Sequence, residues 1–170
     1  MSDLGRREYL TPSRTQLPVS AYFDEALFQR EIETLFRKGP GYVGHSLMVP
    51  EAGDYHALEA ERGGRVLVRS ESGIELLSNV CRHRQAIMLE GRGNTGNIVC
   101  PLHRWTYDLK GELLGAPHFE EQPCLNLGRT PLQNWQGLLF EGPRDVAKDL
   151  ARLGVRQEFD FSGYLLDHVE

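Results

Sequence analysis

The sequence predicts a mainly β, antiparallel fold with one helix before it and one helix after it. Between Tyr42 and Phe140, short runs rich in Val, Ile, Leu and Tyr are separated by Gly, Pro, Asn and Asp, as is typical of strands and turns. Helical spacing of apolar residues is found in the segments on either side. The chain has 170 residues, 40% of them hydrophobic, which suffices for one domain with its own core.

Residues 24–38 are expected to form the first helix. One apolar stripe runs along it, made of Phe28, Ile32, Leu35 and Phe36. Acidic residues in its first turn and basic residues in its last turn complement the helix dipole. Gly39-Pro40 is expected to end it. Residues 1–19, which are polar and contain two prolines, are interpreted as an extended arm.

The strands are expected to begin with a hairpin of residues 66–68 and 74–77, joined at Ser72-Gly73. Further strands are expected at residues 96–99, 105–107, 112–114, 125–127 and 138–140. A second helix is expected over residues 143–153, with Pro143 at its start and Gly154 just after its end. Many short strands with turns between them favour antiparallel sheets.

Composition and charge exclude several classes of protein. With 19 basic and 24 acidic residues the net charge is −5, which argues against a nucleic-acid-binding protein. The longest unbroken apolar run is residues 86–89, far short of the roughly 20 residues needed to span a bilayer, and no secretory leader is visible. Three cysteines are too few for a disulfide scaffold, so we expect a cytoplasmic protein, and in that compartment paired Cys and His more often bind metal.

Two short motifs point to the chemistry. Cys81 and His83 form a C-x-H motif, and after sixteen intervening residues Cys100 and His103 form a C-x-x-H motif. Each motif follows an expected strand, so two tight loops at neighbouring tips would each offer one thiolate and one imidazole. This donor set suits zinc or an iron–sulfur centre.

Two plainer readings of these motifs stay open: four unrelated buried residues, and a structural zinc site. Each half mixes Cys with His, which is less usual for zinc. A two-iron cluster accounts for the mixed halves, because both thiolates can hold one iron and both imidazoles the other.

Residues 81–119 (CRHRQAIMLEGRGNTGNIVCPLHRWTYDLKGELLGAPHF) strongly resemble the Rieske [2Fe–2S] segment of aromatic-ring-hydroxylating oxygenase alpha subunits. Residues 36–58 and 135–140 resemble the entry and the closing strand of that domain, so the resemblance covers most of the chain from about Tyr22. It implies a Rieske-type antiparallel β-sandwich that carries a small cluster-binding subdomain. It also implies that one iron of the cluster is held by Cys81 and Cys100, and the other by His83 and His103.

The resemblance implies the function of an electron-input domain in aromatic hydrocarbon catabolism. Single electrons would pass from a flavin reductase or ferredoxin to a mononuclear Fe(II) site, in an assembly with a neighbouring alpha subunit. Respiratory-chain Rieske proteins carry a disulfide at the positions of Ala86 and Leu102, so that class does not fit. A free-standing Rieske ferredoxin-like carrier is the alternative function, although the length of the chain favours the oxygenase.

Three regions are expected: an arm and helix (1–41), the Rieske domain (42–142), and a helix with the beginning of a catalytic domain (143–170). In the family, the mononuclear iron is held by two His separated by four residues, together with a carboxylate. Four further histidines are present, and none of them has that spacing: His45, His56, His118 and His168. The chain is therefore expected to be an amino-terminal fragment, without a catalytic residue and without hydroxylating activity of its own.

Several residues near the motifs have expected secondary roles. Arg82, Arg84 and Arg104 form a basic rim, which is either a docking surface for an acidic partner or simply solvated. Trp105 and Tyr107 are expected mainly to pack. Two remaining residues are the third cysteine, which is expected to be buried, and a histidine in the segment APHF without a derived role: Cys124 and His118.

Overall fold

A computed structural model describes residues 18–121 and 123–152 of the chain. The expected arm, apart from its last two residues, and the segment after residue 152 lie outside this range. The strands are β1 (Gly41–His45), β2 (Asp54–Ala57), β3 (Arg65–Ser70), β4 (Gly73–Ser78), β5 (Arg92–Asn94), β6 (Ile98–Val99), β7 (Thr106–Tyr107), β8 (Leu113–Gly115), β9 (Arg129–Thr130), β10 (Gln133–Trp135) and β11 (Leu138–Glu141). The helical segments are η2 (Val19–Tyr22), α1 (Glu25–Glu31), η3 (Ile32–Phe36), η4 (Ser46–Met48), η5 (Glu59–Glu61) and α2 (Val146–Arg152).

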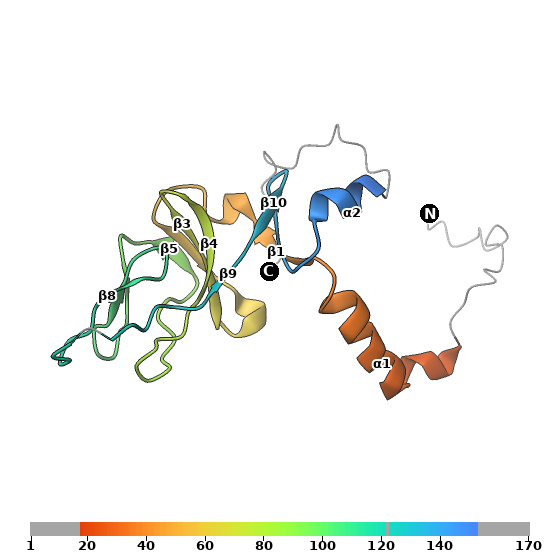
Figure 1. The fold of residues 1–170 in the computed structure, drawn as a ribbon, viewed down its shortest axis with the longest axis horizontal. Helices are drawn as coiled ribbons and strands as arrows, with labels where there is room; N and C mark the ends of the chain where they lie inside the picture. The colour runs from red at the N-terminus through yellow and green to blue at the C-terminus, as the bar shows by residue number, and fades with distance from the viewer. Residues whose placement is uncertain (1–17, 122, 153–170) are drawn as a thin grey trace, which may run out of the picture.

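The described strands form three antiparallel sheets, which confirms the predicted fold class. Their orders are β1-β11-β10, β5-β2-β3-β4-β9 and β6-β7-β8. The small β6-β7-β8 sheet lies at one end of the molecule, and α1 and α2 lie at the other end (Figure 1). The five-stranded sheet lies between the β6-β7-β8 sheet and the two helices.

The predicted hairpin is the centre of this arrangement. β3 and β4 pair from Arg65 opposite Ser78 to Ser70 opposite Gly73. Because side chains alternate along a strand, β3 sends Val66 and Val68 into one apolar cluster and Leu67 into another. Both faces of the hairpin are therefore buried, and the first of these clusters is the one that also contains the two motif cysteines.

The expected strand over residues 125–127 is wrong. Leu127 is buried, but its N–H donates to the carbonyl of Gly111 (2.8 Å), and the Asn126 side chain accepts from the N–H of Leu113 (2.9 Å). These turn contacts replace a strand ladder. Pairing resumes at β9, which lies beside β4.

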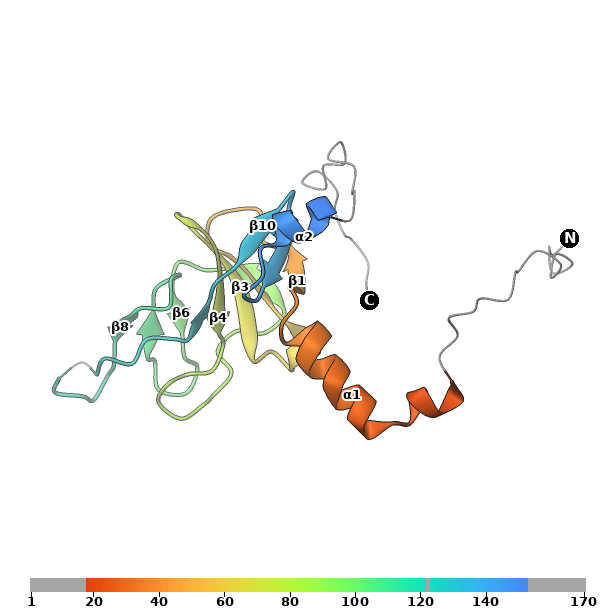
Figure 2. The ribbon, with the colours of Figure 1, turned by 45° about the vertical axis from the view of Figure 1, so that its right-hand side comes forward.

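The first helix forms as expected, but its apolar stripe does not pack on the sheets. Asp24 caps α1, because its Oδ1 accepts from the N–H groups of Ala26 and Leu27 (2.9 and 3.1 Å). The helix continues as a π-helical turn in η3. Much of the stripe is exposed, with 50% of Phe28, 62% of Leu35 and 69% of Phe36 accessible, since the helix extends away from the sheets (Figure 2).

The second helix begins at Val146 rather than at Pro143. Asp145 is responsible, because its Oδ1 accepts from the N–H of Lys148 (3.1 Å), while the Val146 N–H donates to Oε1 of Gln133 (3.0 Å). The Gln133 side chain therefore ties α2 to β10. Within the described ranges, we find no helix with the length and apolar character that a bilayer crossing requires.

A half-buried arginine links two of the sheets. Arg65 on β3 donates through both terminal nitrogens to the carboxylate of Glu141 on β11 (2.6 and 2.9 Å) and through Nε to Glu61 (2.5 Å). This hydrogen-bonded partner lowers the pKa of Glu141 below its usual 4.5. A two-pronged pair of this kind is stronger than a simple surface ion pair.

We expect Glu141→Gln to lower the free energy of unfolding by roughly 1 kcal/mol at pH 7. Because the folded-state pKa of Glu141 lies below the unfolded-state value, the stabilisation is complete above the unfolded pKa and is lost as pH falls through the folded pKa. The variant and the unsubstituted protein should therefore converge at acidic pH. Urea unfolding at a series of pH values tests this, with Glu33→Gln in the exposed Arg37–Glu33 pair as the control. A constant difference at all pH values would contradict it.

Candidate metal centre

Two hairpin loops carry the motif residues, and their backbones close in the same way. In the first loop the Cys81 N–H donates to the carbonyl of Ala86 (2.9 Å), and the Gln85 N–H donates back to the carbonyl of Cys81 (2.9 Å). In the second, the Cys100 N–H donates to the carbonyl of Trp105 (2.8 Å), and the Arg104 N–H to that of Cys100 (3.1 Å). Each cysteine therefore occupies the first position of an equivalent loop.

The fourth residue after each cysteine has a left-handed backbone. Gln85 has φ of 57° and Arg104 has φ of 62°, a region that glycine and asparagine enter more easily. The sequence carried no signal for this pair, since neither residue is one that usually marks such a turn. The strain is compensated by the two backbone hydrogen bonds in each loop.

A buried asparagine, missed in the sequence, fixes the base of the first loop. Asn79 is fully buried, and its Nδ2 donates to the carbonyls of Gly63 (2.8 Å) and Leu89 (2.6 Å). Its Oδ1 accepts from the N–H of Leu89 (2.9 Å). The side chain thus joins both sides of the loop that contains Cys81. The sequence signal that could have identified this residue is an asparagine two residues before the first motif cysteine.

The two cysteines lie in the core beneath the loops. Cys81 and Cys100 are 1% and 2% exposed, and both belong to the apolar cluster that includes Val66 and Leu77 of the central hairpin. Neither forms a disulfide. Apolar residues of the five-stranded sheet therefore belong to the same buried cluster as both cysteines.

The two motif histidines meet at the loop tips. The ring centroids of His83 and His103 are 4.8 Å apart, at an interplanar angle of 73°. The Nδ1 atoms of both rings are buried and have no hydrogen-bond partner. A buried nitrogen without a partner is costly, and a metal ion would compensate that cost.

Burial and the nearby His103 and Arg84 lower the pKa of His83. The His83 imidazole is therefore neutral at pH 7, and a neutral ring is the form that binds metal.

Tyr107, on β7, touches the sulfur side of the site. Its hydroxyl lies 3.7 Å from Sγ of Cys81 and accepts a hydrogen bond from the N–H of Arg82 (3.2 Å). Burial, as the main cause, raises the pKa of Tyr107 to about 12, so the phenol keeps its proton. Because a thiolate can only accept, the phenol is the donor when Cys81 is deprotonated. The expectation that Tyr107 mainly packs was thus incomplete.

The donor set fits a group with two metal ions. A two-iron cluster needs a pair of ligands on each iron. Two buried thiols below and two imidazoles with unpartnered nitrogens above meet that requirement.

Other candidate residues lie apart from this site or have different roles. His45 is buried, and its Nδ1 accepts from the N–H of Leu47 (3.0 Å), so it caps η4. Cys124 is exposed, which makes the expectation of a buried thiol wrong, because the irregular segment before β9 leaves it uncovered. Arg82, Arg84 and Arg104 are exposed beside the histidines, as a basic rim requires.

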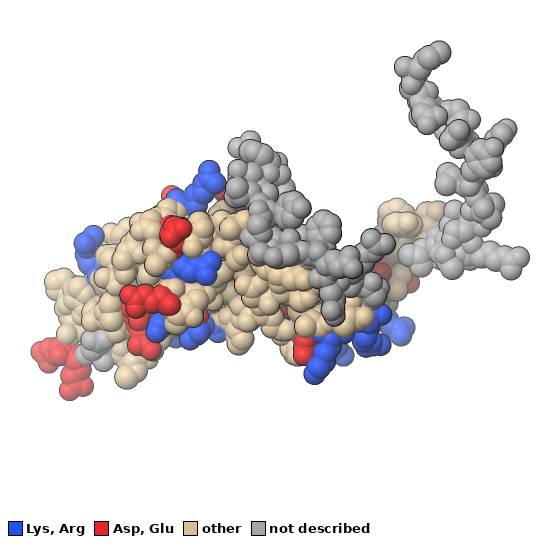
Figure 3. Space-filling view, turned by 90° about the horizontal axis from the view of Figure 1, so that it is seen from above, with Lys and Arg blue, Asp and Glu red and all other residues tan. Residues whose placement is uncertain are grey.

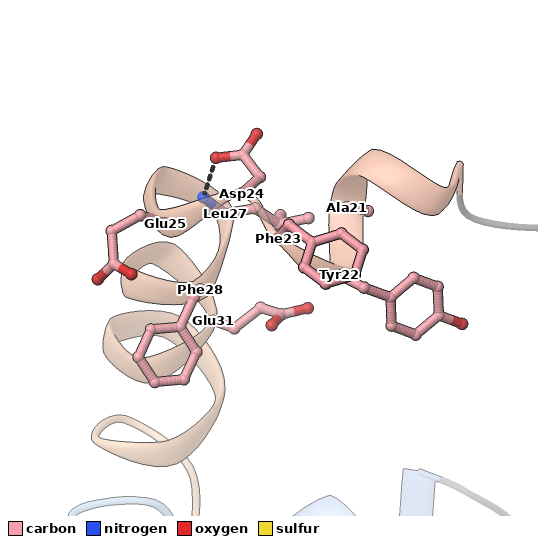
Figure 4. Close-up of a pocket in the computed structure, with 8 residues that line it drawn as sticks. All are labelled: Ala21, Tyr22, Phe23, Asp24, Glu25, Leu27, Phe28 and Glu31. Atoms are coloured by element: carbon pink, nitrogen blue, oxygen red, sulfur yellow. Dashed lines mark hydrogen bonds between the residues drawn. The ribbon is translucent and has the colours of Figure 1, made fainter.

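The motif residues line neither of two hollows on the surface. One of about 360 Å³ lies at the bend between η2 and α1, where Figure 4 shows the rings of Tyr22, Phe23 and Phe28. A second, of about 530 Å³, lies between η3 and the end of β11, and Phe36 and Pro143 are among its lining residues.

Comparison with known proteins agrees with this geometry. The family described as "Rieske [2Fe-2S] domain" matches residues 40–132. Putrescine 2-hydroxylase of Ralstonia nicotianae is 75% identical over the whole chain, and the chain covers 47% of that protein. Putrescine 2-hydroxylase of Bordetella bronchiseptica is 58% identical, again over the whole chain, which covers 43% of it. The chain thus spans just under half the length of these curated relatives.

A more distant relative and two solved structures show the same fold. The alpha subunit of biphenyl 2,3-dioxygenase of Rhodococcus jostii is 33% identical, covering 95% of this chain and 37% of its own length. A quaternary ammonium Rieske monooxygenase superimposes with a TM-score of 0.64 at 25% identity, over 79% of this chain and 40% of that one. Naphthalene 1,2-dioxygenase superimposes with a TM-score of 0.63 at 26% identity, over 77% of this chain and 32% of that one.

We expect Tyr107→Phe to lower the free energy of unfolding by about 1 kcal/mol, because the Arg82 N–H and the Cys81 sulfur both lose their partner. Urea unfolding of the chain measures the effect. Tyr42→Phe is the matched control, because the Tyr42 ring is half exposed and its hydroxyl can bond to water. If both variants were equally stable, the Tyr107 contact would contribute nothing.

Proposed function

This chain belongs to the Rieske [2Fe–2S] domain family, and we propose from that premise that it is the electron-transfer domain of a Rieske-type oxygenase. One observation carries the proposal: two equivalent loops bring together two buried thiols and two imidazoles whose Nδ1 atoms have no partner. When bound, a [2Fe–2S] cluster accepts and releases one electron at a time. The role of the chain is to hold it at an exposed tip, where redox partners can approach.

The ligands in this proposal are the four motif residues. Cys81 and Cys100 hold one iron through their sulfurs, and His83 and His103 hold the other through Nδ1. Burial of both thiols supports the first pair, and the unpartnered ring nitrogens support the second. Tyr107 supplies a hydrogen bond to one ligand sulfur.

We place the Rieske domain at residues 42–142, with residues 1–41 before it and the start of a catalytic domain within residues 143–170. Pairing of β1 with β11 supports these boundaries, because it brings the two ends of the domain side by side. The electrons would pass to the mononuclear iron of the catalytic domain, in the same or a neighbouring subunit.

For the substrate of the complete enzyme we propose an aliphatic diamine such as putrescine. The support is the identity of 75% and 58% to two putrescine 2-hydroxylases over the whole chain. Aromatic hydrocarbons, which the sequence resemblance implied, are not confirmed, because the aromatic dioxygenases among the relatives are far less similar. Hydroxylation of putrescine but not of biphenyl by the full-length protein, with its reductase, tests this assignment.

The electron donor is proposed to be a reductase or ferredoxin with an acidic surface. Arg82, Arg84 and Arg104 are exposed next to the histidines and would face such a partner. On the face seen in Figure 3, acidic side chains gather at the left end, basic ones gather at the lower right, and both signs are mixed between them. The local rim of arginines would mainly raise the rate of encounter.

Cys81→Ser, Cys100→Ser and alanine at either motif histidine should each abolish cluster binding, because each removes one of four ligands. The purified chain should contain about two iron and two acid-labile sulfide per molecule and show a rhombic EPR signal when reduced. Cys124→Ser is the control and should keep full iron content, since this thiol is exposed and apart from the loops. Bound zinc without sulfide would contradict the proposal.

Arg84→Glu should slow reduction of the cluster by the donor about tenfold at low ionic strength, and the difference should shrink as salt is added. Stopped-flow reduction at several salt concentrations measures this. Arg30→Glu changes the charge equally on α1, at the opposite end of the molecule, and should leave the rate unchanged. Equal rates for both variants at low salt would refute the docking role.

A further inference from the structure

The segment Ala116–Phe119 follows the small β6-β7-β8 sheet and has no role in the ligand set. Its backbone forms a tight turn, in which the Phe119 N–H donates to the carbonyl of Ala116 (3.3 Å). Pro117 occupies the second position of the turn, and His118 occupies the third with φ of 71°. This is the pattern of a type II turn, whose third position favours Gly or Asn. The histidine is therefore held in a strained conformation.

The turn places the Phe119 ring against the metal centre. Its centroid lies 5.9 Å from that of His83 at an interplanar angle of 89°, and 5.2 Å from that of Trp105 at 83°. Both are edge-to-face contacts, a geometry that aromatic rings prefer. Phe119 is 48% exposed, so burial alone does not account for its position.

Trp105 also packs against His83, one of the two motif histidines. Its ring stacks on His83 at a centroid distance of 5.1 Å and an interplanar angle of 5°. Trp105 is 1% exposed and belongs to the core cluster that contains both cysteines, so it is a fixed surface for the imidazole. His83 thus stacks on a rigid ring, and the Phe119 ring stands perpendicular to both members of this stack.

The two histidines differ in this respect. Among the described residues, His83 makes ring contacts with His103, Trp105 and Phe119, whereas the ring contact found for His103 is the one with His83. A change at Phe119 should therefore act on one imidazole of the pair. This asymmetry allows a positioning effect to be separated from a general loss of stability.

We propose that Phe119, presented by the strained Pro117-His118 turn, is a positioning residue that packs beside both rings of the His83–Trp105 stack and so keeps the His83 imidazole in its metal-binding orientation. The proposal rests on the function proposed above, in which His83 holds an iron. Strain at His118 is then the cost of aiming the Phe119 ring at a ligand. Because the ring also contacts the imidazole, it would shield a metal-bound His83 from water and chelators.

Phe119→Leu tests this positioning role, because it keeps an apolar side chain but removes the ring. Two measurements on the purified chain serve as readouts: the ¹⁴N couplings of the two histidines by pulsed EPR of the reduced chain, and the rate at which an iron chelator bleaches the oxidised chain. We expect one of the two nitrogen couplings to shift and bleaching to become about fivefold faster. Phe119→Tyr keeps the ring and should restore the values of the unsubstituted protein.

Leu114→Ala is the matched control. Leu114 is 51% exposed on the neighbouring strand β8 and makes no ring contact, so its variant should keep both couplings and the bleaching rate. His118→Val and His118→Asn test the turn itself. A β-branched residue disfavours a positive φ and should reproduce the Phe119→Leu result, whereas Asn tolerates it and should not.

The outcomes separate the two proposals. If the unsubstituted chain binds no iron–sulfur cluster, the proposed function fails. If it binds the cluster but Phe119→Leu leaves both nitrogen couplings and the bleaching rate unchanged, the positioning role of Phe119 is overturned and the proposed function stands. Equal shifts of both couplings, or a similar effect of Leu114→Ala, would show a general loosening of the structure and would also overturn it.

Discussion

The site depends on one constraint: the same pattern of backbone hydrogen bonds closes both motif loops. In each loop the cysteine N–H bonds to the carbonyl five residues ahead, and this fixes the direction of the thiol relative to the hairpin. Because side chains alternate across a strand, a slip of one residue in either hairpin would turn the cysteine away from its counterpart. The four donors can converge only while both registers are kept.

Those registers are kept by the core beneath the loops. β3 and β4 supply side chains to both apolar clusters, and one of these clusters holds Cys81, Cys100, Trp105 and Tyr107 together. Asn79 then links the two sides of the first loop through two hydrogen bonds to Leu89, and a third ties the loop to Gly63. The site is thus a surface feature built on an interior that leaves little freedom to its base.

At the loop tips, neighbouring aromatic rings help to place the two histidine side chains. Trp105 and Phe119 both contact the His83 ring, whereas the ring contact found for His103 among the described residues is the one with His83. The two ligands proposed for one iron therefore have different surroundings, so packing can tune one of them separately. Such tuning by neighbouring side chains is common at metal sites and affects both orientation and water access.

The sequence by itself determined the fold class, the central hairpin and the two Cys-His motifs, because these depend on residue type and local spacing. Alternation of apolar residues predicted β3 and β4, and sixteen residues between the motifs predicted two separate loops.

The sequence did not determine the left-handed backbone of Gln85 and Arg104, the role of Asn79 or the placement of Phe119. Each of these depends on partners distant in the chain or on strain that neighbouring hydrogen bonds compensate. The sequence also predicted a strand at residues 125–127, where the contact of Leu127 with Gly111 decided otherwise, and a buried Cys124, which the irregular segment before β9 leaves exposed. Local preference fixes which elements form, and only tertiary contacts decide which side chains meet, because their energies depend on distances that the sequence does not contain.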